Sequence, residues 1–269
     1  MKLFRLIIIG GAMAILAGCN GNTKEHALPD NSPVKNESPS QQEMTNDASD
    51  SDTNNHKQSI ALSFKDIEAP RKPLSLRDSK ADRYTAMMRM KLKNGEIEIF
   101  RKASDEEQVY AALHIGSKVY EIGEIGNAVS AVDLYEASDT AAFSEDDMKV
   151  TGAIGANAPI AYYIGLDESA PFLLVRIDGH TLEADANNDG SLEIISTVGT
   201  AADTTIYQQT GDRIEAANVN EALGAQIVVY DSSVNLFQAY AEGAGETFTQ
   251  WKMTASTLHL LPQKTMNPQ

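Results

Sequence analysis

Oxygen-bearing side chains stand at every second position in one short segment of the chain. The five residues are Asp185, Asn187, Asp189, Ser191 and Glu193. Side-chain oxygens at positions 1, 3 and 5 converge on one centre where the chain turns sharply, and Gly190 at position 6 allows that turn. Ser191 adds a backbone carbonyl, and Glu193 adds a further carboxylate. Because hard cations take oxygen ligands of this kind, the spacing predicts a site for Ca²⁺.

The segment does not fit an EF-hand. Position 12 is Ser196 where that motif needs a bidentate acid, and the loop continues into the β-rich run 192–195 instead of a helix. The alternative is an Asx-rich turn that closes by hydrogen bonds from side chains to the backbone and holds no ion. If calcium binds, we expect it to stiffen the loop, because the adjacent sequence offers no base for an activated water.

The acidic segment resembles the calcium loops of integrin alpha-chain propellers and of bacterial FG-GAP or VCBS repeats. The resemblance covers residues 181–213, from the acidic loop through the strand Glu193-Ile194-Ile195 to a strand ending in Ile206-Tyr207. It implies a β-propeller-like binding module in which Asp185, Asn187, Asp189, Ser191 and Glu193 occupy the family's ligand positions. The chain departs from the pattern by carrying Glu at position 9, where these loops more often carry Asp. It is also short for seven blades, so four or five small blades or an incomplete ring are expected.

The elements around this loop are predicted to be strands. Short apolar stretches punctuated by Gly, Asn and Asp are typical of an all-β domain, with a β-sandwich as the alternative to the propeller. Beyond the two hairpins described next, the predicted strands cover 128–135, 160–166, 172–178, 192–198, 204–208, 226–230, 236–241 and 247–253.

Two hairpins are predicted in the first part of this region. Asn94-Gly95 favours a two-residue type I′ turn, which pairs Leu92 with Ile97 and Met90 with Ile99 on one face. The other face then pairs Lys93 with Glu96 and Lys91 with Glu98, so that apolar and charged faces separate. A second hairpin is predicted to turn at Gly116-Ser117, between strands 109–115 and 118–122.

An internal similarity suggests repeats. Residues 184–195 align without gaps on residues 217–228, an offset of 33, and a weaker copy spans 116–135. The second copy has Asn218, Asn220 and Ala222 at the ligand positions, which is too little charge to hold calcium well. Degenerate copies of this kind favour a repeat fold, and chance similarity between two-stranded units is the alternative.

The N-terminal residues have the pattern of a targeting signal. Lys2 and Arg5 precede an apolar run over 6–17 that is too short to span a membrane and is typical of a secretory signal. Leu16-Ala17-Gly18-Cys19 at its end resembles the bacterial lipobox, which implies cleavage before Cys19 and acylation of this residue, the sole cysteine. We therefore expect a signal peptide at 1–18, a lipidated cysteine and disordered tether at 19–57, the all-β domain at 58–262 and a tail at 263–269. The alternative is an ordinary signal peptide with an incidental cysteine.

The net charge of the chain argues against two classes of binding partner. The chain has 22 Lys and Arg against 38 Asp and Glu, a formal net charge of −16. Such acidity argues against sequence-independent nucleic-acid binding and against docking on anionic lipids by charge. The expected partners are the membrane, through the N-terminal lipid on the extracytoplasmic face, and an envelope protein or glycan.

A search for catalytic residues finds no hydrolase, phosphate-loop or dinucleotide motif. His114, His180 and His259 are interpreted as structural. The aromatics Trp251, Tyr162, Tyr163, Tyr207, Tyr230 and Tyr240 are interpreted as core packing and not as a sugar-stacking surface. The predicted function is a noncatalytic binding or scaffolding module. The alternatives are a cell-envelope hydrolase or carbohydrate-active enzyme using acids such as Glu121, Glu124, Asp133 and Asp178, and a chaperone or inhibitor of a secreted protein.

Overall fold

The structure is a computed structural model, and it describes residues 58–67, 71–78, 83–127, 132–156, 158–167, 170–243 and 247–262. The predicted signal peptide, Cys19, the tether and the tail lie outside these residues. The described part is almost entirely antiparallel β-sheet, which confirms the all-β prediction. None of its helices is long and apolar enough to cross a membrane.

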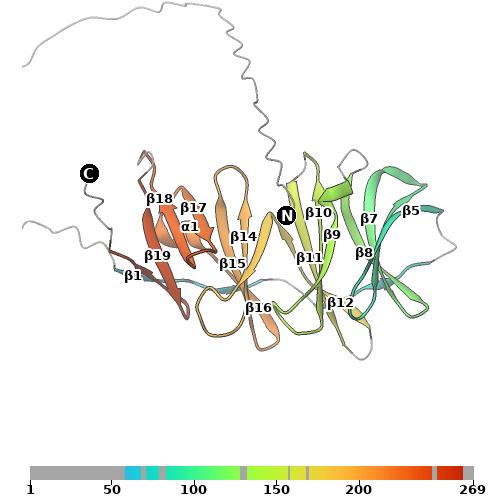
Figure 1. Cartoon of the computed structure of the whole chain (residues 1–269), viewed down its shortest axis with the longest axis horizontal. Helices are drawn as coiled ribbons and strands as arrows, with labels where there is room; N and C mark the ends of the chain where they lie inside the picture. The colour runs from blue at the N-terminus through green and yellow to red at the C-terminus, as the bar shows by residue number, and fades with distance from the viewer. Residues whose placement is uncertain are drawn as a thin grey trace, which may run out of the picture. The chain divides into compact units, whose positions relative to one another are not determined.

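Four units, each of four consecutive antiparallel strands, make up most of the described chain (Figure 1). The first two units are joined into one ten-stranded sheet by a short parallel pairing at Gly126 and Ala153. The first unit contains β5 (Tyr84–Lys91), β6 (Glu96–Lys102), β7 (Asp105–Ile115) and β8 (Lys118–Asn127). The second contains β9 (Glu136–Thr140), β10 (Asp147–Ile154), β11 (Ala158–Leu166) and β12 (Pro171–Asp178), after a short 3₁₀ helix at Val132–Leu134. The third contains β13 (His180–Ala184), β14 (Glu193–Val198), β15 (Asp203–Thr210) and β16 (Arg213–Asn218). After the helix α1 (Val219–Leu223), the fourth contains β17 (Ile227–Asp231), β18 (Leu236–Tyr240), β19 (Thr249–Thr254) and β20 (Thr257–Leu260).

A segment that precedes the four units adds a fifth strand to each of them. We call residues 58–67 and 71–78 the strap. Its strands are β1 (Ser59–Ala61), β2 (Lys65–Asp66), β3 (Lys72–Pro73) and β4 (Ser75–Leu76). They pair in reverse order with the last strand of each unit: β1 with β20, β2 with β16, β3 with β12 and β4 with β8. The strap therefore runs past all four units, from the fourth to the first.

Apolar side chains fill three seams between successive units. In the first seam, Ile97 and Ile99 of the first unit join Tyr162 and Ile164 of the second. In the second seam, Tyr163 and Ile177 of the second unit meet Ile194 of the third. In the third seam, Ile195 and Ile206 of the third unit meet Phe237, Trp251 and Met253 of the fourth. Antiparallel sheets packed through such seams fit the sandwich alternative.

The central strands of the two middle units are buried on both faces. Successive residues of a strand point to opposite faces, so Tyr162 enters the first seam while Tyr163 enters the second. Ile194 and Ile195 divide in the same way between the second and third seams. This double burial explains why these strands read as continuous apolar runs instead of an alternating pattern.

The strap contributes a side chain to every seam. Leu62 is buried in the third seam, Ile67 packs into the second and Leu74 packs into the first. Beyond Leu74, Arg77 crosses the outer face of the first unit, where its guanidinium lies over the rings of Tyr84 and Phe100. The strands of the strap have only two or three residues each. The strap is therefore held against the four units by these side-chain contacts as well as by its short β-ladders.

The Asn94-Gly95 hairpin forms, but the predicted register was wrong. Lys91 pairs with Glu96 and Met90 with Ile97, so the loop has four residues instead of two. Neither Asn94 nor Gly95 has the positive φ that a type I′ turn needs. Contacts with other strands decide the geometry here, because a Cβ on Gly95 would lie 2.7 Å from the carbonyl oxygen of His114.

The predicted separation of the two faces nevertheless holds. Met90 and Ile97 face the first seam, and Lys91 and Glu96 share the other side. The hairpin at Gly116-Ser117 is confirmed, with Ile115 paired to Lys118 and Gly116 at φ 58°.

Two further predictions were wrong. The predicted strand 128–135 contains the 3₁₀ helix at Val132–Leu134 in its described part. The 33-residue offset is not the structural repeat either. Residues 184–195 span a loop inside the third unit, whereas residues 217–228 span α1, which connects the third unit to the fourth. The real repeat is the four-stranded unit, whose first strands begin at Tyr84, Glu136, His180 and Ile227.

Candidate functional site

The predicted cation loop connects β13 to β14 in the third unit. Ala184 pairs with Glu193 across its base, so residues 185–192 form a closed loop at one end of a hairpin. Asn188 with φ 61° and Gly190 with φ 93° supply two left-handed turns. Asn and Gly are the residues that adopt this conformation most readily, which is why the chain can reverse here.

The side chains of the loop accept hydrogen bonds from the backbone N–H groups of the same loop. The Asp185 carboxylate accepts hydrogen bonds from the backbone N–H groups of Asp189 at 2.9 Å and of Gly190 at 3.1 Å. Asn187 Oδ1 accepts the same Asp189 N–H at 2.8 Å, and Asp189 Oδ1 accepts the N–H of Ser191 at 2.8 Å. In this state the loop closes on itself as the Asx-rich alternative describes.

The amide of Asn187 lies between two carboxylates. Its Nδ2 donates to Glu193 Oε1 at 2.8 Å and to Asp189 Oδ2 at 3.0 Å. Glu193 is 2% exposed, and its Oε2 accepts the N–H of Ala186 at 2.8 Å. The fold therefore brings Asp185, Asn187, Asp189 and Glu193 together, and Ser191 joins through its backbone N–H.

Two acids of the loop have opposite electrostatic surroundings. Burial raises the pKa of Glu193, and the nearby charges of Asp189 and Asp185 add to that effect. The pKa of Asp189 is lowered, chiefly by the Ser191 N–H and then by the Asn187 side chain. A cation among these oxygens would favour the charged form of Glu193, because an opposite charge stabilises a carboxylate.

The donor set matches a hard cation in kind, since every candidate ligand is an oxygen. The orientation of Asn187 differs from what a cation needs, because its nitrogen and not its oxygen faces Glu193. Ion uptake would require this amide to rotate. Among the described residues, no group of three or more His, Cys, Asp or Glu side chains is arranged to hold a metal ion.

The loop faces a hollow of about 850 Å³, which we call the loop hollow. Hairpin loops of three successive units line it. The lining comprises residues 141–145 of the second unit, Asn187, residues 189–193 and residues 208–211 of the third, and Ala255 and Ser256 of the fourth. This lining contains carboxylates, amides and hydroxyls but no Lys, Arg or His.

Three strap residues hold the walls of the loop hollow. Leu62 N–H donates to the carbonyl of Ser256 at 2.8 Å. Asp66 pairs with Arg213 at 2.8 Å, beside the turn 211–212. Arg71 lies 3.5 Å from Asp212 in the same turn. The N-terminal segment thus fixes loops from two different units around one hollow.

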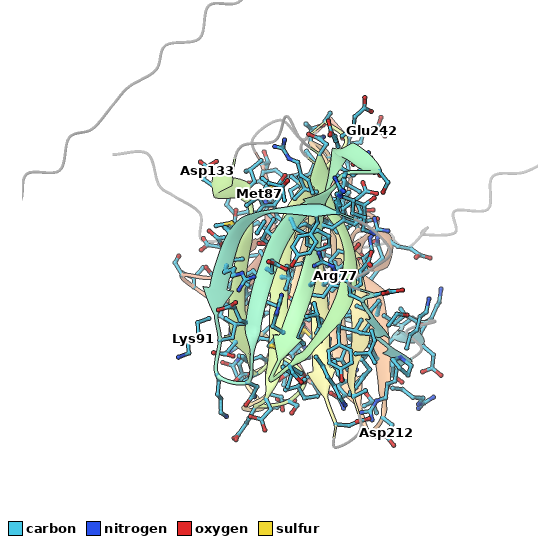
Figure 2. The ribbon with its side chains drawn as sticks, turned by 90° about the vertical axis from the view of Figure 1, so that its right-hand side faces the viewer. Arg77, Met87, Lys91, Asp133, Asp212 and Glu242 are labelled. Carbon is cyan, nitrogen blue, oxygen red and sulfur yellow. The ribbon has the colours of Figure 1, made fainter. Side chains whose placement is uncertain are left out.

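A second polar cluster, on the outer face of the first unit, was missed by the sequence analysis (Figure 2). Glu98 is 0% exposed there, and its Oε1 accepts from Arg89 Nη2 at 2.8 Å. Its Oε2 lies 3.2 Å from Arg77 Nη1 and 3.0 Å from His114 Nε2. The predicted hairpin paired Glu98 with Lys91, but in the structure Arg89 lies opposite Glu98 and Arg77 of the strap covers this face.

The remaining candidate acids lie on different elements. Glu121, which shares β8 with Glu124, pairs with Lys102 of β6. Asp178 pairs with Arg176 at the end of β12, and Asp133 is exposed on the 3₁₀ helix. The backbone carbonyl of Glu124 accepts from Tyr162. His180 lines a smaller hollow of about 360 Å³ together with Asp133 and Lys149.

Three of the aromatics lie in the core. Trp251, Tyr162 and Tyr163 are buried in the three seams, so they offer no exposed stacking surface. Tyr207 and Tyr230 pack partly buried against the second and third seams. Tyr240 packs against Phe248, with ring centroids 5.3 Å apart.

Comparison with known proteins gives no relative: no protein-family model, curated protein or solved structure matches the chain.

Proposed function

We propose that this chain is a noncatalytic binding module, held on the extracytoplasmic face of the cell membrane by a lipid on Cys19. The single observation that carries the binding role is the loop hollow, to which three successive units each contribute loops. Loops presented by a rigid β scaffold are a common place for binding sites. The four units themselves are proposed to be an open series of blades, which corresponds to the incomplete ring and not to a closed propeller.

The chemistry of the lining suggests the kind of partner. Carboxylates at Glu145 and Asp189 accept hydrogen bonds and repel anions, and the side-chain amides of Gln208 and Gln209 can both accept and donate. A ligand rich in donors, such as a glycan or a cationic segment of an envelope protein, would complement them. The hydrolase alternative is not proposed for the loop hollow, because Glu121, Asp133 and Asp178 are not part of its lining.

Calcium is proposed as a structural ion of the loop 185–192. Bound calcium would supply positive charge at the point where Asp185, Asp189 and Glu193 approach one another. Asn187 would turn its amide oxygen inward, and Ser191 would offer its carbonyl. A cation that binds only the folded loop stabilises the folded state, and the stabilisation grows with the logarithm of its concentration above Kd, so the ion would fix one wall of the loop hollow.

Site-specific photo-crosslinking in native membranes tests the binding role. A photoreactive residue replaces Gln209 in the loop hollow, and in a matched control it replaces Lys252, which is exposed on the fourth unit. The expected result is a discrete adduct from position 209 that the control lacks. Equal adducts from both positions, or none from position 209, would contradict a binding role for the hollow.

The anchor is tested separately by metabolic labelling with palmitate. The wild-type chain should incorporate label and partition with membranes, and Cys19→Ser should do neither. Retention of label by the variant would show that the proposed lipid attachment is wrong.

A further inference from the structure

A buried carboxyl lies beneath one wall of the loop hollow. Asp147 is the first residue of β10 and directly follows the loop 141–146, which we call the wall loop. It is 3% exposed, and its Oδ2 has no hydrogen-bond partner among the described residues. A neutral acid tolerates such a position far better than a carboxylate, because an unpaired buried charge is costly.

The wall loop is packed on both sides. Thr140 Oγ1 accepts the N–H of Ala142 at 3.2 Å and donates to Glu183 at 2.6 Å. The ring of Phe143 lies edge-on to Tyr163, with centroids 5.7 Å apart. On the other side, Asp146 pairs with Lys93 of the first unit at 2.7 Å. Any charge on Asp147 would therefore arise beneath a closely packed loop.

Among the described residues, Arg71 of the strap is the cation whose charge acts on the Asp147 carboxyl. Arg71 is near the carboxyl, yet its guanidinium also lies 3.5 Å from Asp212 and 5.3 Å from the ring centre of Phe172. From its own loop, Asp147 faces the negative charge of Asp146 and a hydrogen bond from the backbone of Ser144. Across the hairpin, β9 presents the uncharged Thr140.

These surroundings favour the protonated form up to neutral pH. Burial raises the pKa of Asp147 to about 7 and Asp146 adds to the rise, whereas Ser144 and Arg71 oppose it. Because the folded-state pKa lies above the unfolded value, the folded state binds the extra proton. The resulting stabilisation is full below the unfolded pKa and is lost as pH rises to about 7.

We propose that Asp147 is a proton switch for the wall loop, acting through Arg71 of the strap. With Asp147 neutral, the wall loop packs and Arg71 pairs with Asp212. When the proton leaves, Arg71 is drawn from Asp212 toward Asp147, and the wall loop loosens. The wall loop lines the loop hollow, so the switch would regulate access to that hollow. Only this last step rests on the proposed function.

Amide hydrogen exchange of the full chain tests the switch. After correction for intrinsic rates, protection of the Ala142 N–H, which donates to Thr140 Oγ1, should fall about tenfold between pH 6 and pH 8, the factor that one unit of pKa represents. Asp147→Asn, which mimics the neutral acid, should keep its protection at both pH values. The matched control Glu145→Gln removes an exposed acid of the same loop and should keep the wild-type response.

A second measurement does not depend on that variant folding. Carboxyl carbon NMR of the wild-type chain should show a buried Asp titrating near neutral pH, and Arg71→Gln should move its midpoint higher. Unchanged protection between pH 6 and pH 8, or no carboxyl that responds to Arg71→Gln, would overturn the proposal. Neither experiment uses a binding partner. If the crosslinking experiment fails, the outcome of these two measurements is therefore unaffected.

Discussion

The side-chain nitrogen of Asn187 donates to Glu193 Oε1 over 2.8 Å, and so holds apart two acids that would otherwise meet. Asn187→Asp replaces that donor with a third carboxylate. In chelator, the variant should lose about 3–6 kcal/mol of unfolding free energy, because two hydrogen bonds to charged acceptors, each worth about 1.5–3 kcal/mol, disappear. Millimolar calcium should restore more stability to this variant than to the wild type.

Thermal melts with and without calcium check this prediction. Asn188→Asp is the matched control, because it adds the same charge one residue further on, at an exposed position facing Asn235. If both variants behave alike, the interpretation of Asn187 as the centre of the loop is wrong.

Glu98 should make the stability of the first unit depend on acid pH. Burial would raise the pKa of Glu98, but hydrogen bonds from Arg89 and His114 outweigh it and leave the pKa lowered. Its stabilisation is therefore present above the unfolded pKa and is lost as pH falls through the folded one. At pH 7, Glu98→Ala should cost about 3–5 kcal/mol, since Arg77 is left buried without its partner.

Urea unfolding at pH 7 and at pH 3 measures this effect. The difference between wild type and Glu98→Ala should shrink at the lower pH, while Glu107→Ala, at an exposed position on β7, should change little at either. A difference that is constant with pH would contradict the ionised state of Glu98.

Leu62 should matter far more than its neighbour in the strap. It is 6% exposed in the third seam, so Leu62→Ala should cost about 2–5 kcal/mol through lost burial and a cavity. Ser63 is exposed, and Ser63→Ala should be nearly neutral. Chemical denaturation of both variants decides the matter: equal midpoints would mean that the strap does not hold the units together.

Local sequence predicted the positions of some strands but missed others, among them β9, β10, β13 and β16, and it did not predict the pairings between distant segments. The Gly116-Ser117 turn followed from its residues because two-residue loops are governed locally. At Asn94-Gly95, contacts with Asp139 and Asp146 of the second unit accompany a different register, and these contacts leave no local signal. The strap was missed because strands of two exposed residues have no periodicity to detect.

The candidate site, too, could be predicted only in part from local sequence. The alternating acids at 185–193 predicted a loop whose side chains converge, because residues so close in sequence are positioned by one turn. The hollow that they face could not be predicted, since its other walls come from residues 141–145, 208–211 and 255–256. Asp147 and Glu98 were missed because their burial depends on chain segments far away in sequence, and the strap supplies Arg71 and Arg77 to them.

Calcium-dependent melting of the full chain tests the proposed role of the 185–192 loop most directly. The account predicts that added calcium chloride raises the melting temperature of the wild type in a concentration-dependent way, and that Asp189→Ala abolishes the rise. Identical wild-type melting curves in calcium and in chelator would contradict the proposed ion, and an equal rise in Asp189→Ala would place any bound calcium elsewhere.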